Sequence, residues 1–352
     1  MMNTAFIRTN GTTTAFAAGI VLSAFACSVA FAEPGVATGD TSKSKIGFSN
    51  SYSGSSFRQV MNQSFEEIAK NAQTDGLIGS YGLVTANNNA TEQATQIQNM
   101  ILDGYNAITI LAASDTALNG AVKDACDAGI VIVVFGGRVT EPCAYIVNYD
   151  WASLGKQEVE YMAEALGGKG NLLEIRGIAG DSTDKDISDG LHKALEPYPE
   201  MKIVGTVYGQ WTATVAQKEV ATILPTLPEI DGIIDQGGDG YGAAVAFEAA
   251  GRRTPVIIMG NRQDELAWWA KQRDANGYKT MSLSAAPSAS QVAFWVAQQI
   301  LAGKDVPKYV EIPLLVITEP ELDAYLASTP VGGVANATYS QADAVAMIDA
   351  MN

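Results

Sequence analysis

The sequence contains few of the residues from which most enzyme and metal sites are built. Its 352 residues include one histidine, His192, and three cysteines, with no Cys-x-x-Cys pair. A zinc site or a histidine-based catalytic centre is therefore not expected. Neither a Gly-x-Ser-x-Gly elbow nor a Gly-x-x-x-x-Gly-Lys loop occurs. We assign no catalytic residue, no metal and no cofactor, and we expect His192 on a helix surface.

Positive charge is also scarce. The chain has 22 lysines and arginines against 38 aspartates and glutamates, which gives a formal net charge of −16. It has no cluster of basic residues and no helix-turn-helix segment before its first predicted strand, so no nucleic-acid partner is expected. Charged residues make up only 17% of the chain, and its length is sufficient for two domains with full cores.

Residues 1–32 have the pattern of a cleaved export signal. Arg8 is their only charge, an apolar stretch runs from Ala15 to Ala26, and Ala30-Phe31-Ala32 forms a cleavage site of the A-x-A type. The alternatives are a membrane anchor, for which the apolar stretch is short, and a lipoprotein signal at Cys27. We predict an exported mature protein with no later membrane-spanning segment.

Cleavage at that site leaves two cysteines, Cys126 and Cys143. An even number of cysteines outside the cytoplasm favours a disulfide. Cys126 ends a predicted helix, and Cys143 follows the next predicted strand by one turn, so the chain returns close to Cys126. The alternative is two buried free thiols. We predict the bond, which closes a loop of about 18 residues.

Two stretches of the chain repeat the same unit. Residues 106–136 and 231–260 each contain a buried strand, a polar turn with an aspartate (Asp115 and Asp239), a helix of small residues and a second strand. This repetition indicates two similar α/β domains. In open parallel sheets, ligands bind beyond the carboxyl ends of the strands. Both aspartates are therefore at candidate binding positions.

Strands and helices alternate along the chain from residue 45 onward, which predicts parallel sheets with right-handed crossovers. We expect an N-terminal domain over residues 45–150, with a return segment near 285–310. A C-terminal domain is expected over 151–284, with one final strand near 309–317. Residues 318–352 are predicted to form a tail with a short helix, a loop and a final helix.

The loops after the predicted strands carry aromatic and hydrogen-bonding side chains. Proteins hold sugars in this way, because rings stack on C–H faces while amides and carboxylates bind the hydroxyls. The candidate ligand contacts are Asn50, Tyr52, Phe57, Arg58, Asp115, Lys185, Trp211, Asp239, Asn261 and Arg262.

Three of these candidates have a structural alternative. Phe57 fits the buried face of a helix predicted near 57–73, and Trp211 could belong to the core. Asp115 could cap the helix that follows it, a frequent use of aspartate. We expect the Trp211 ring in a cleft, because it follows a strand and precedes a helix start at Thr212.

Three segments carry a family resemblance: ITILAASDTALNGAVKDACDAGIVIVVF, IRGIAGDSTDKDISDGLHKAL, and QGGDGYGAAVAFEAAG followed by IIMGN. They resemble the type I periplasmic sugar-binding proteins of ABC transporters, in the branch of the ribose-binding proteins, and the likeness covers residues 45–317. The resemblance implies two Rossmann-like domains, joined by three hinge strands, that close on a ligand. It also implies a periplasmic monomer whose partner is an ABC permease in the inner membrane.

The resemblance implies roles for individual residues. Asp115 matches the aspartate that binds sugar hydroxyls, and Trp211 matches an aromatic ring that stacks on the sugar. Lys185 stands where ribose-binding members have a ligand-binding arginine. Asn261 or Arg262 stands where those members have an aspartate.

Ala285 or Ala286 falls where the family has a glutamine, so hydroxyl partners of ribose are missing. Sites built on hydrogen bonds discriminate strongly between ligands. The ligand expected is another sugar, a sugar acid or a polyol, and Arg58, Lys185 and Arg262 are suited to a carboxylate. The predicted function is that of a solute-binding protein that delivers its ligand to the permease. The alternatives are a secreted carbohydrate-active enzyme and a sugar-sensing module for a membrane receptor.

Overall fold

The computed structural model describes residues 35–352, which all belong to one unit. The predicted export signal over 1–32 and its Cys27 lie outside the described residues. Between residues 35 and 352, no helix is both long enough and apolar enough to cross a membrane.

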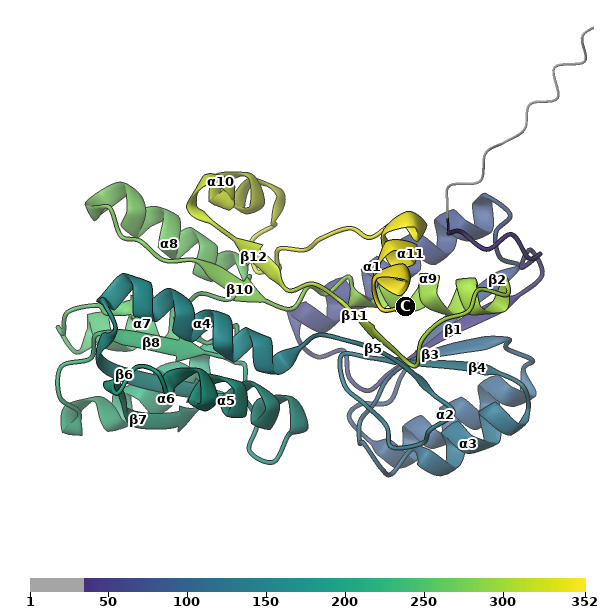
Figure 1. The fold of residues 1–352 in the computed structure, drawn as a ribbon, viewed down its shortest axis with the longest axis horizontal. Helices are drawn as coiled ribbons and strands as arrows, with labels where there is room; N and C mark the ends of the chain where they lie inside the picture. Colours follow the sequence, from purple (N-terminus) through teal and green to yellow (C-terminus); the bar gives the residue numbers. More distant parts are fainter. Residues whose placement is uncertain (1–34) are drawn as a thin grey trace, which may run out of the picture. The chain divides into compact units, whose positions relative to one another are not determined.

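The first lobe, called the N-terminal lobe here, is built on a parallel six-stranded sheet of order β11-β5-β4-β3-β1-β2 (Figure 1). Its strands are β1 (Lys45–Asn50), β2 (Ser80–Thr85), β3 (Ala107–Leu111), β4 (Val131–Phe135), β5 (Tyr145–Asn148) and β11 (Tyr309–Glu311). Successive strand residues point to opposite faces of the sheet. Both faces are covered by helices, which explains why the central strands β3 and β4 are nearly all apolar.

Alternate residues of one strand enter two different cores. Val133 and Phe135 of β4 pack in the core that includes Phe65 and Phe294. Those two phenylalanines belong to α1 (Ser56–Thr74) and α9 (Ala289–Leu301). Ile132 and Val134 pack in a second core under α2 (Ala90–Leu102) and α3 (Asn119–Asp127).

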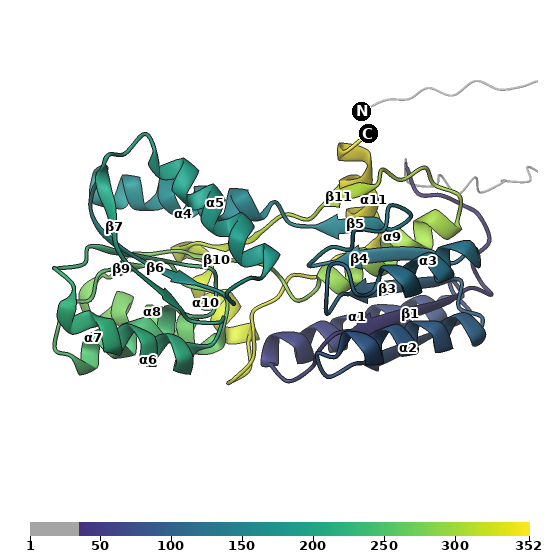
Figure 2. The ribbon, with the colours of Figure 1, turned by 90° about the horizontal axis from the view of Figure 1, so that it is seen from below.

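The second lobe, called the C-terminal lobe here, contains a parallel four-stranded sheet of order β7-β6-β8-β9 (Figure 2). Its strands are β6 (Lys169–Arg176), β7 (Glu200–Tyr208), β8 (Gly232–Asp235) and β9 (Val256–Ile257). Its helices are α4 (Trp151–Leu166), α5 (Ser182–Leu195), α6 (Ala213–Ile223), α7 (Gly240–Ala249) and α8 (Gln263–Asn276). The prediction of an α/β fold with parallel sheets is confirmed.

The predicted single strand over 309–317 is wrong, because two strands occupy this range. β11 pairs with β5 of the N-terminal lobe, with Val310 opposite Val147. β12 (Leu315–Ile317) pairs antiparallel with β10 (Ser282–Ser284) beside the C-terminal lobe. Pro313 lies between them, and its missing N–H and fixed φ interrupt a ladder of backbone hydrogen bonds.

The tail contains the predicted short helix, loop and final helix. α10 (Glu319–Ser328) packs against α8 of the C-terminal lobe, and α11 (Gln341–Ala350) packs against α9 of the N-terminal lobe. The loop between them therefore connects the two lobes. It is held by hydrogen bonds from Ala335 N to Asn261 O (2.7 Å) and from Asn336 Nδ2 to Ser64 Oγ (2.9 Å).

The predicted disulfide is present. Cys126 near the end of α3 is bonded to Cys143 in the turn before β5, at a sequence separation of 17. Both cysteines are half-buried against the core under α2 and α3. The bond therefore fastens the end of α3 to the turn that leads into β5, the last strand before the chain passes to the C-terminal lobe.

Candidate functional site

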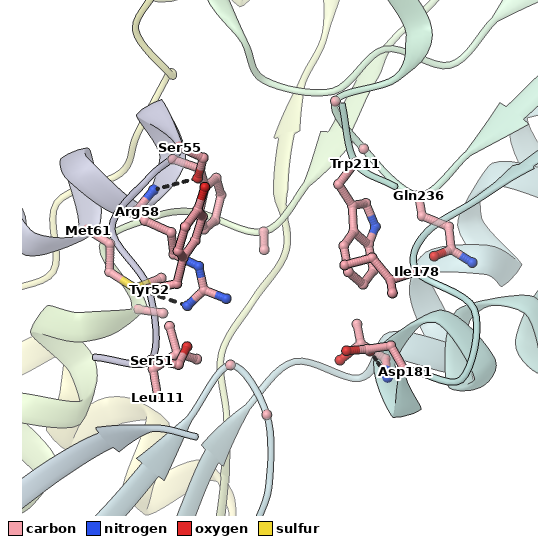
Figure 3. A pocket seen from close by; sticks show the side chains of 18 of the residues that line it. Ser51, Tyr52, Ser55, Arg58, Met61, Leu111, Ile178, Asp181, Trp211 and Gln236 are labelled. Atoms are coloured by element: carbon pink, nitrogen blue, oxygen red, sulfur yellow. Dashed lines mark hydrogen bonds between the residues drawn. The ribbon is translucent and has the colours of Figure 1, made fainter. Parts of the chain in front are cut away.

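A cavity of about 750 Å³ lies between the lobes and is lined by loops from both. Figure 3 shows Tyr52, Arg58 and Met61 on one side and Ile178, Asp181 and Trp211 on the other, with open space between them. The volume lies within the range of sites for small molecules. The lining loops follow the carboxyl ends of β1, β3, β4, β6, β7 and β8, where parallel sheets bind ligands.

The N-terminal wall is formed by the loop that joins β1 to α1. Ser55 is the N-cap of α1, and its hydroxyl accepts a hydrogen bond from the backbone N–H of Arg58 (3.3 Å). Tyr52 lines the cavity with 41% of its surface exposed. Phe57 lines the cavity and also packs against the core, so its ring lies at the boundary between the two.

The Arg58 guanidinium points into this cavity (Figure 3). Its Nη1 lies 4.0 Å from the sulfur of Met61. Burial lowers the pKa of Arg58 to about 10, against the opposing effect of Asp181 and Tyr52. The guanidinium thus stays protonated at neutral pH, and Arg58 is half-buried in the cavity wall.

Trp211 forms the facing wall and has an unusual backbone. Gln210 and Trp211 have φ values of 57° and 52°, which non-glycine residues seldom adopt and which store strain at functional sites. The indole packs against Gly177, where an added Cβ would come within 2.3 Å of Cζ2. Arg262 Nη2 donates to the Trp211 carbonyl (2.7 Å) and holds the turn. The helix start expected at Thr212 is confirmed, since Thr212 is the N-cap of α6.

The loop after β6 is fixed by buried polar contacts. Asp184 accepts from Arg176 Nε (3.1 Å) and Nη2 (2.7 Å) and from the N–H of Gly177 (3.0 Å). Gln236 accepts from the same N–H (3.0 Å) and donates to the Asp184 carbonyl (3.0 Å). Asp181 caps α5 by accepting from the backbone N–H groups of Thr183 and Asp184. These bonds place Ile178, Asp181 and Gln236 at the cavity wall.

Asp115 lines the cavity but does not cap a helix. β3 already ends at Leu111, and the N-cap of α3 is Leu118, which makes no side-chain cap bond. The Asp115 carboxylate instead accepts from Arg138 Nε (3.3 Å), and Arg138 Nη1 donates to Asp186 of α5 (3.2 Å). Arg138 therefore links the two lobes through an ion pair on each side.

Three of the residues selected from the sequence lie outside the cavity lining. Asn50 is fully buried, and its amide donates to Asn62 Oδ1 (2.7 Å). Lys185 is on the exposed side of α5, where it pairs with Asp189 one turn away. Asp239 is fully buried at the start of α7, and the pKa of its carboxyl is raised to about 7, chiefly by burial and then by Glu265. The remaining selected residues all line the cavity: Tyr52, Phe57, Arg58, Asp115, Trp211, Asn261 and Arg262.

Sequence reasoning missed an aromatic pair at the point where the chain passes from β5 to α4. The rings of Tyr149 and Trp151 lie 4.9 Å apart at a tilt of 49°, and both residues line the cavity. The Tyr149 hydroxyl donates to the Ala286 carbonyl (2.8 Å) and accepts from the Ala286 N–H (3.0 Å). The Trp151 indole N–H is buried and has no hydrogen-bond partner among the described residues. The signal available in the sequence was two aromatic residues at the boundary between the two strand series.

No group of three or more His, Cys, Asp or Glu residues within 35–352 is arranged to hold a metal ion. The cavity is lined by aromatic rings, amides, hydroxyls, two carboxylates and two guanidinium groups. Such a lining can enclose a small polar molecule and bond to it from two sides. The fold and this site define a class of proteins in which two α/β lobes surround a cleft for a small ligand.

Residues 46–305 match the family model of the periplasmic binding protein domain, and the chain belongs to this family. A xylitol-binding protein of Mycolicibacterium smegmatis is 30% identical over 233 residues, which are 64% of this chain and 66% of that protein. A D-apiose import binding protein of Paraburkholderia graminis is 30% identical over 55% of this chain and 63% of its own length. These matches span less than two thirds of the length of each curated relative.

Solved structures share the fold. An ABC transporter solute binding protein from Thermobispora bispora is 35% identical, with a TM-score of 0.78, over 88% of this chain and 96% of that one. A solute binding protein from Bacillus halodurans with bound myo-inositol is 21% identical, with a TM-score of 0.70, over 82% and 99%. At 21% identity, the likeness to the Bacillus halodurans protein shows a common fold alone.

Proposed function

We propose that this chain is an extracytoplasmic solute-binding protein that captures a sugar, a sugar acid or a polyol and delivers it to an ABC permease. The observation that carries this proposal is the cavity lined by both lobes, with the Trp211 indole on one wall and hydrogen-bonding groups around it. Aromatic rings pack on the C–H faces of sugars and polyols, while polar side chains bind their hydroxyls. The names of the xylitol- and apiose-binding relatives support the same ligand class.

Capture of the ligand is expected to be linked to closure of the lobes. A molecule that contacts Arg58 on one lobe and Trp211 on the other stabilises the arrangement in which both are in reach. The shift is limited by the difference in ligand affinity between the closed and the open form. The closed form then presents one rigid surface to the permease.

We also propose that the protein acts as a periplasmic monomer and not as an enzyme. One chain supplies all the described walls of the cavity, so no second copy is needed to complete them. His192, a candidate general base by residue type, lies exposed in the last turn of α5 with its Nε2 3.3 Å from Glu174, and it does not line the cavity. Export through a cleaved signal accords with the predicted leader and with the disulfide.

The test is a binding measurement on the purified mature chain. A thermal-shift screen with sugars, sugar acids and polyols, together with mass spectrometry of the co-purified molecule, should identify a ligand. Trp211→Ala should then weaken its binding at least about tenfold, since 1.4 kcal/mol corresponds to a factor of ten. Tyr309→Ala, which removes a partly exposed ring of β11 outside the cavity, is the matched control. A Trp211→Ala protein that melts much earlier but keeps its affinity would place this ring in the core and contradict the proposal.

A further inference from the structure

Arg58 differs from the other arginines of the described chain in what its guanidinium contacts. Arg138, Arg176, Arg253 and Arg273 each form an ion pair with a carboxylate. Arg252 donates to backbone carbonyls. Within residues 35–352, no oxygen atom accepts a hydrogen bond from the Arg58 guanidinium. Its charge is therefore directed into the cavity without a partner (Figure 3).

The carboxylates that line the described cavity accept no hydrogen bond from the Arg58 guanidinium. Asp181 lies on the facing lobe, and its Oδ1 accepts from the backbone N–H groups of Thr183 (2.7 Å) and Asp184 (3.3 Å). Asp115 is paired with Arg138. α1 has no acidic residue in its first turn, so the positive end of this helix adds to the charge of Arg58.

The second arginine of the cavity, Arg262, is already compensated. Its Nη2 donates to the Trp211 carbonyl, and its backbone N–H donates to Glu265 Oε2 (3.2 Å). Glu265 and Asp239, both fully buried, lie near Arg262; burial raises the pKa of each carboxyl, and the positive charge of Arg262 offsets part of that shift. Among the described lining residues, Arg58 is thus the cation that lacks an acceptor.

Several wall positions offer no side-chain hydrogen bond at all. Gly136, Gly137, Ala285 and Ala286 line the cavity with hydrogen or methyl side chains. Part of the ligand surface therefore meets no polar side chain. The guanidinium of Arg58 accordingly contributes a larger share of the polar contacts to the ligand. A guanidinium with its fork of donors binds a carboxylate through two parallel hydrogen bonds, and such charge-assisted bonds are roughly twice as strong as neutral ones.

We propose that the ligand is a sugar acid, a polyhydroxylated carboxylate whose carboxylate group is bound by Arg58 and whose C–H face packs on Trp211. This inference rests on the proposed function and narrows its ligand class. A neutral sugar or polyol that fills the same place displaces water from the Arg58 guanidinium and offers it only hydroxyl acceptors, which compensate the charge less well. The Arg58 guanidinium and the Trp211 indole face each other across the open space of the cavity (Figure 3).

The experiment compares acids with neutral compounds of matched shape. Titration calorimetry at pH 7 measures D-galacturonate against D-galactose and D-gluconate against D-glucitol on the wild-type chain. At least one acid should bind about tenfold or more tightly than its neutral counterpart, in line with the strength of hydrogen bonds to charged groups. Arg58→Gln should weaken the acid by a similar factor and the neutral compound by less than about threefold. Lys193→Gln, which removes an exposed positive charge on α5, should change neither affinity.

The outcomes separate this inference from the function on which it rests. Binding of neutral compounds without the acids overturns the inference and leaves the solute-binding function in place. Equal losses for acid and neutral ligand in Arg58→Gln also overturn it, because the residue would then be a donor to hydroxyls. If no member of this panel binds, the inference is overturned, and the solute-binding function is decided by the wider screen and by the co-purified molecule. If Arg58→Gln does not fold, two other measurements decide the question. One is the preference of the wild-type chain for the acids over the neutral compounds. The other is the affinity of Arg58→Lys, whose single ammonium group should bind the carboxylate more weakly than the guanidinium does.

Discussion

Asp239 is expected to contribute to the pH dependence of stability without binding ligand, beside the buried Glu158, Asp235 and Glu265, whose pKa values burial also raises. Its carboxylate is fully buried at the start of α7, and neither of its oxygens has a hydrogen-bond partner among the described residues. Its pKa is raised from 3.8 to about 7 by burial and by the neighbouring Glu265, while Arg262 and the nearby backbone N–H groups of Thr212 and Trp211 offset only part of this. In the folded protein the carboxyl therefore keeps its proton over several pH units in which the unfolded chain has lost it.

The sign and size of the effect follow from this difference. Between about pH 4 and pH 7 the folded state binds one proton more than the unfolded state, so the free energy of unfolding falls as the pH rises. A pKa raised from 3.8 to about 7 is a shift of about three pH units, which at 1.36 kcal/mol each sets an upper limit of about 4 kcal/mol. The side-chain amide of the Asp239→Asn protein has no proton to lose in this range. Relative to wild type, this variant should gain up to about 4 kcal/mol between pH 4 and pH 8.

Urea unfolding followed by tryptophan fluorescence at pH 4.5, 6 and 8 measures this difference. Asp75→Asn, at the exposed C-cap of α1, is the matched control and should keep the wild-type pH profile. Parallel pH profiles for Asp239→Asn and wild type would refute the reasoning. A loss of ligand affinity in Asp239→Asn with an unchanged profile would instead restore Asp239 as a ligand contact.

Three further predictions concern the disulfide, the ion pairs between the lobes and closure. Replacing Cys126 and Cys143 by serine should lower the free energy of unfolding by about 3 kcal/mol, given the sequence separation of 17. Thiol titration of the denatured, unreduced wild-type mature protein should find no free thiol. Two reactive thiols would contradict this. Arg138→Gln should lower ligand affinity less than about fivefold, because exposed ion pairs contribute about 0–1 kcal/mol, and high salt should abolish the difference. Small-angle scattering should give a smaller radius of gyration with saturating ligand, and an unchanged radius would point to a rigid pocket.

The order of strands and helices could be predicted from the sequence because buried strands and amphipathic helices leave clear periods. Helix α4, for example, begins after its N-cap Asp150 and ends at Gly167, which has a φ of 66°, and aspartate and glycine are the residue types expected at these two ends. The strand over 309–317 was predicted wrongly because its apolar run continues across Pro313. Hydrophobic pattern alone could not reveal that its two halves pair in different sheets.

The sequence allowed us to predict which loops form the site, but not the directions in which their side chains point. Trp211 and Arg58 line the cavity as expected from their places after strands. Asp239 also follows a strand, yet its side chain is buried against Gly209, where an added Cβ would lie 2.7 Å from the carboxylate. Trp151 was missed because a tryptophan in the first turn of a helix has the same sequence signature whether it faces a core or a cavity.

The path of the chain has a consequence for the order in which the lobes fold. The four-stranded sheet of the C-terminal lobe is made from residues within 169–257, whereas the N-terminal lobe needs α9 and β11 from the far end of the chain. Ser290 of α9 bonds to Met61 across a separation of 229 residues, and Phe294 covers Phe65. Closing such long loops is slow, because the chain entropy is lost before the contacts form. During synthesis, one face of the first sheet is thus covered only by α1 until residues 289–301 arrive, and the lobe that begins first is completed last.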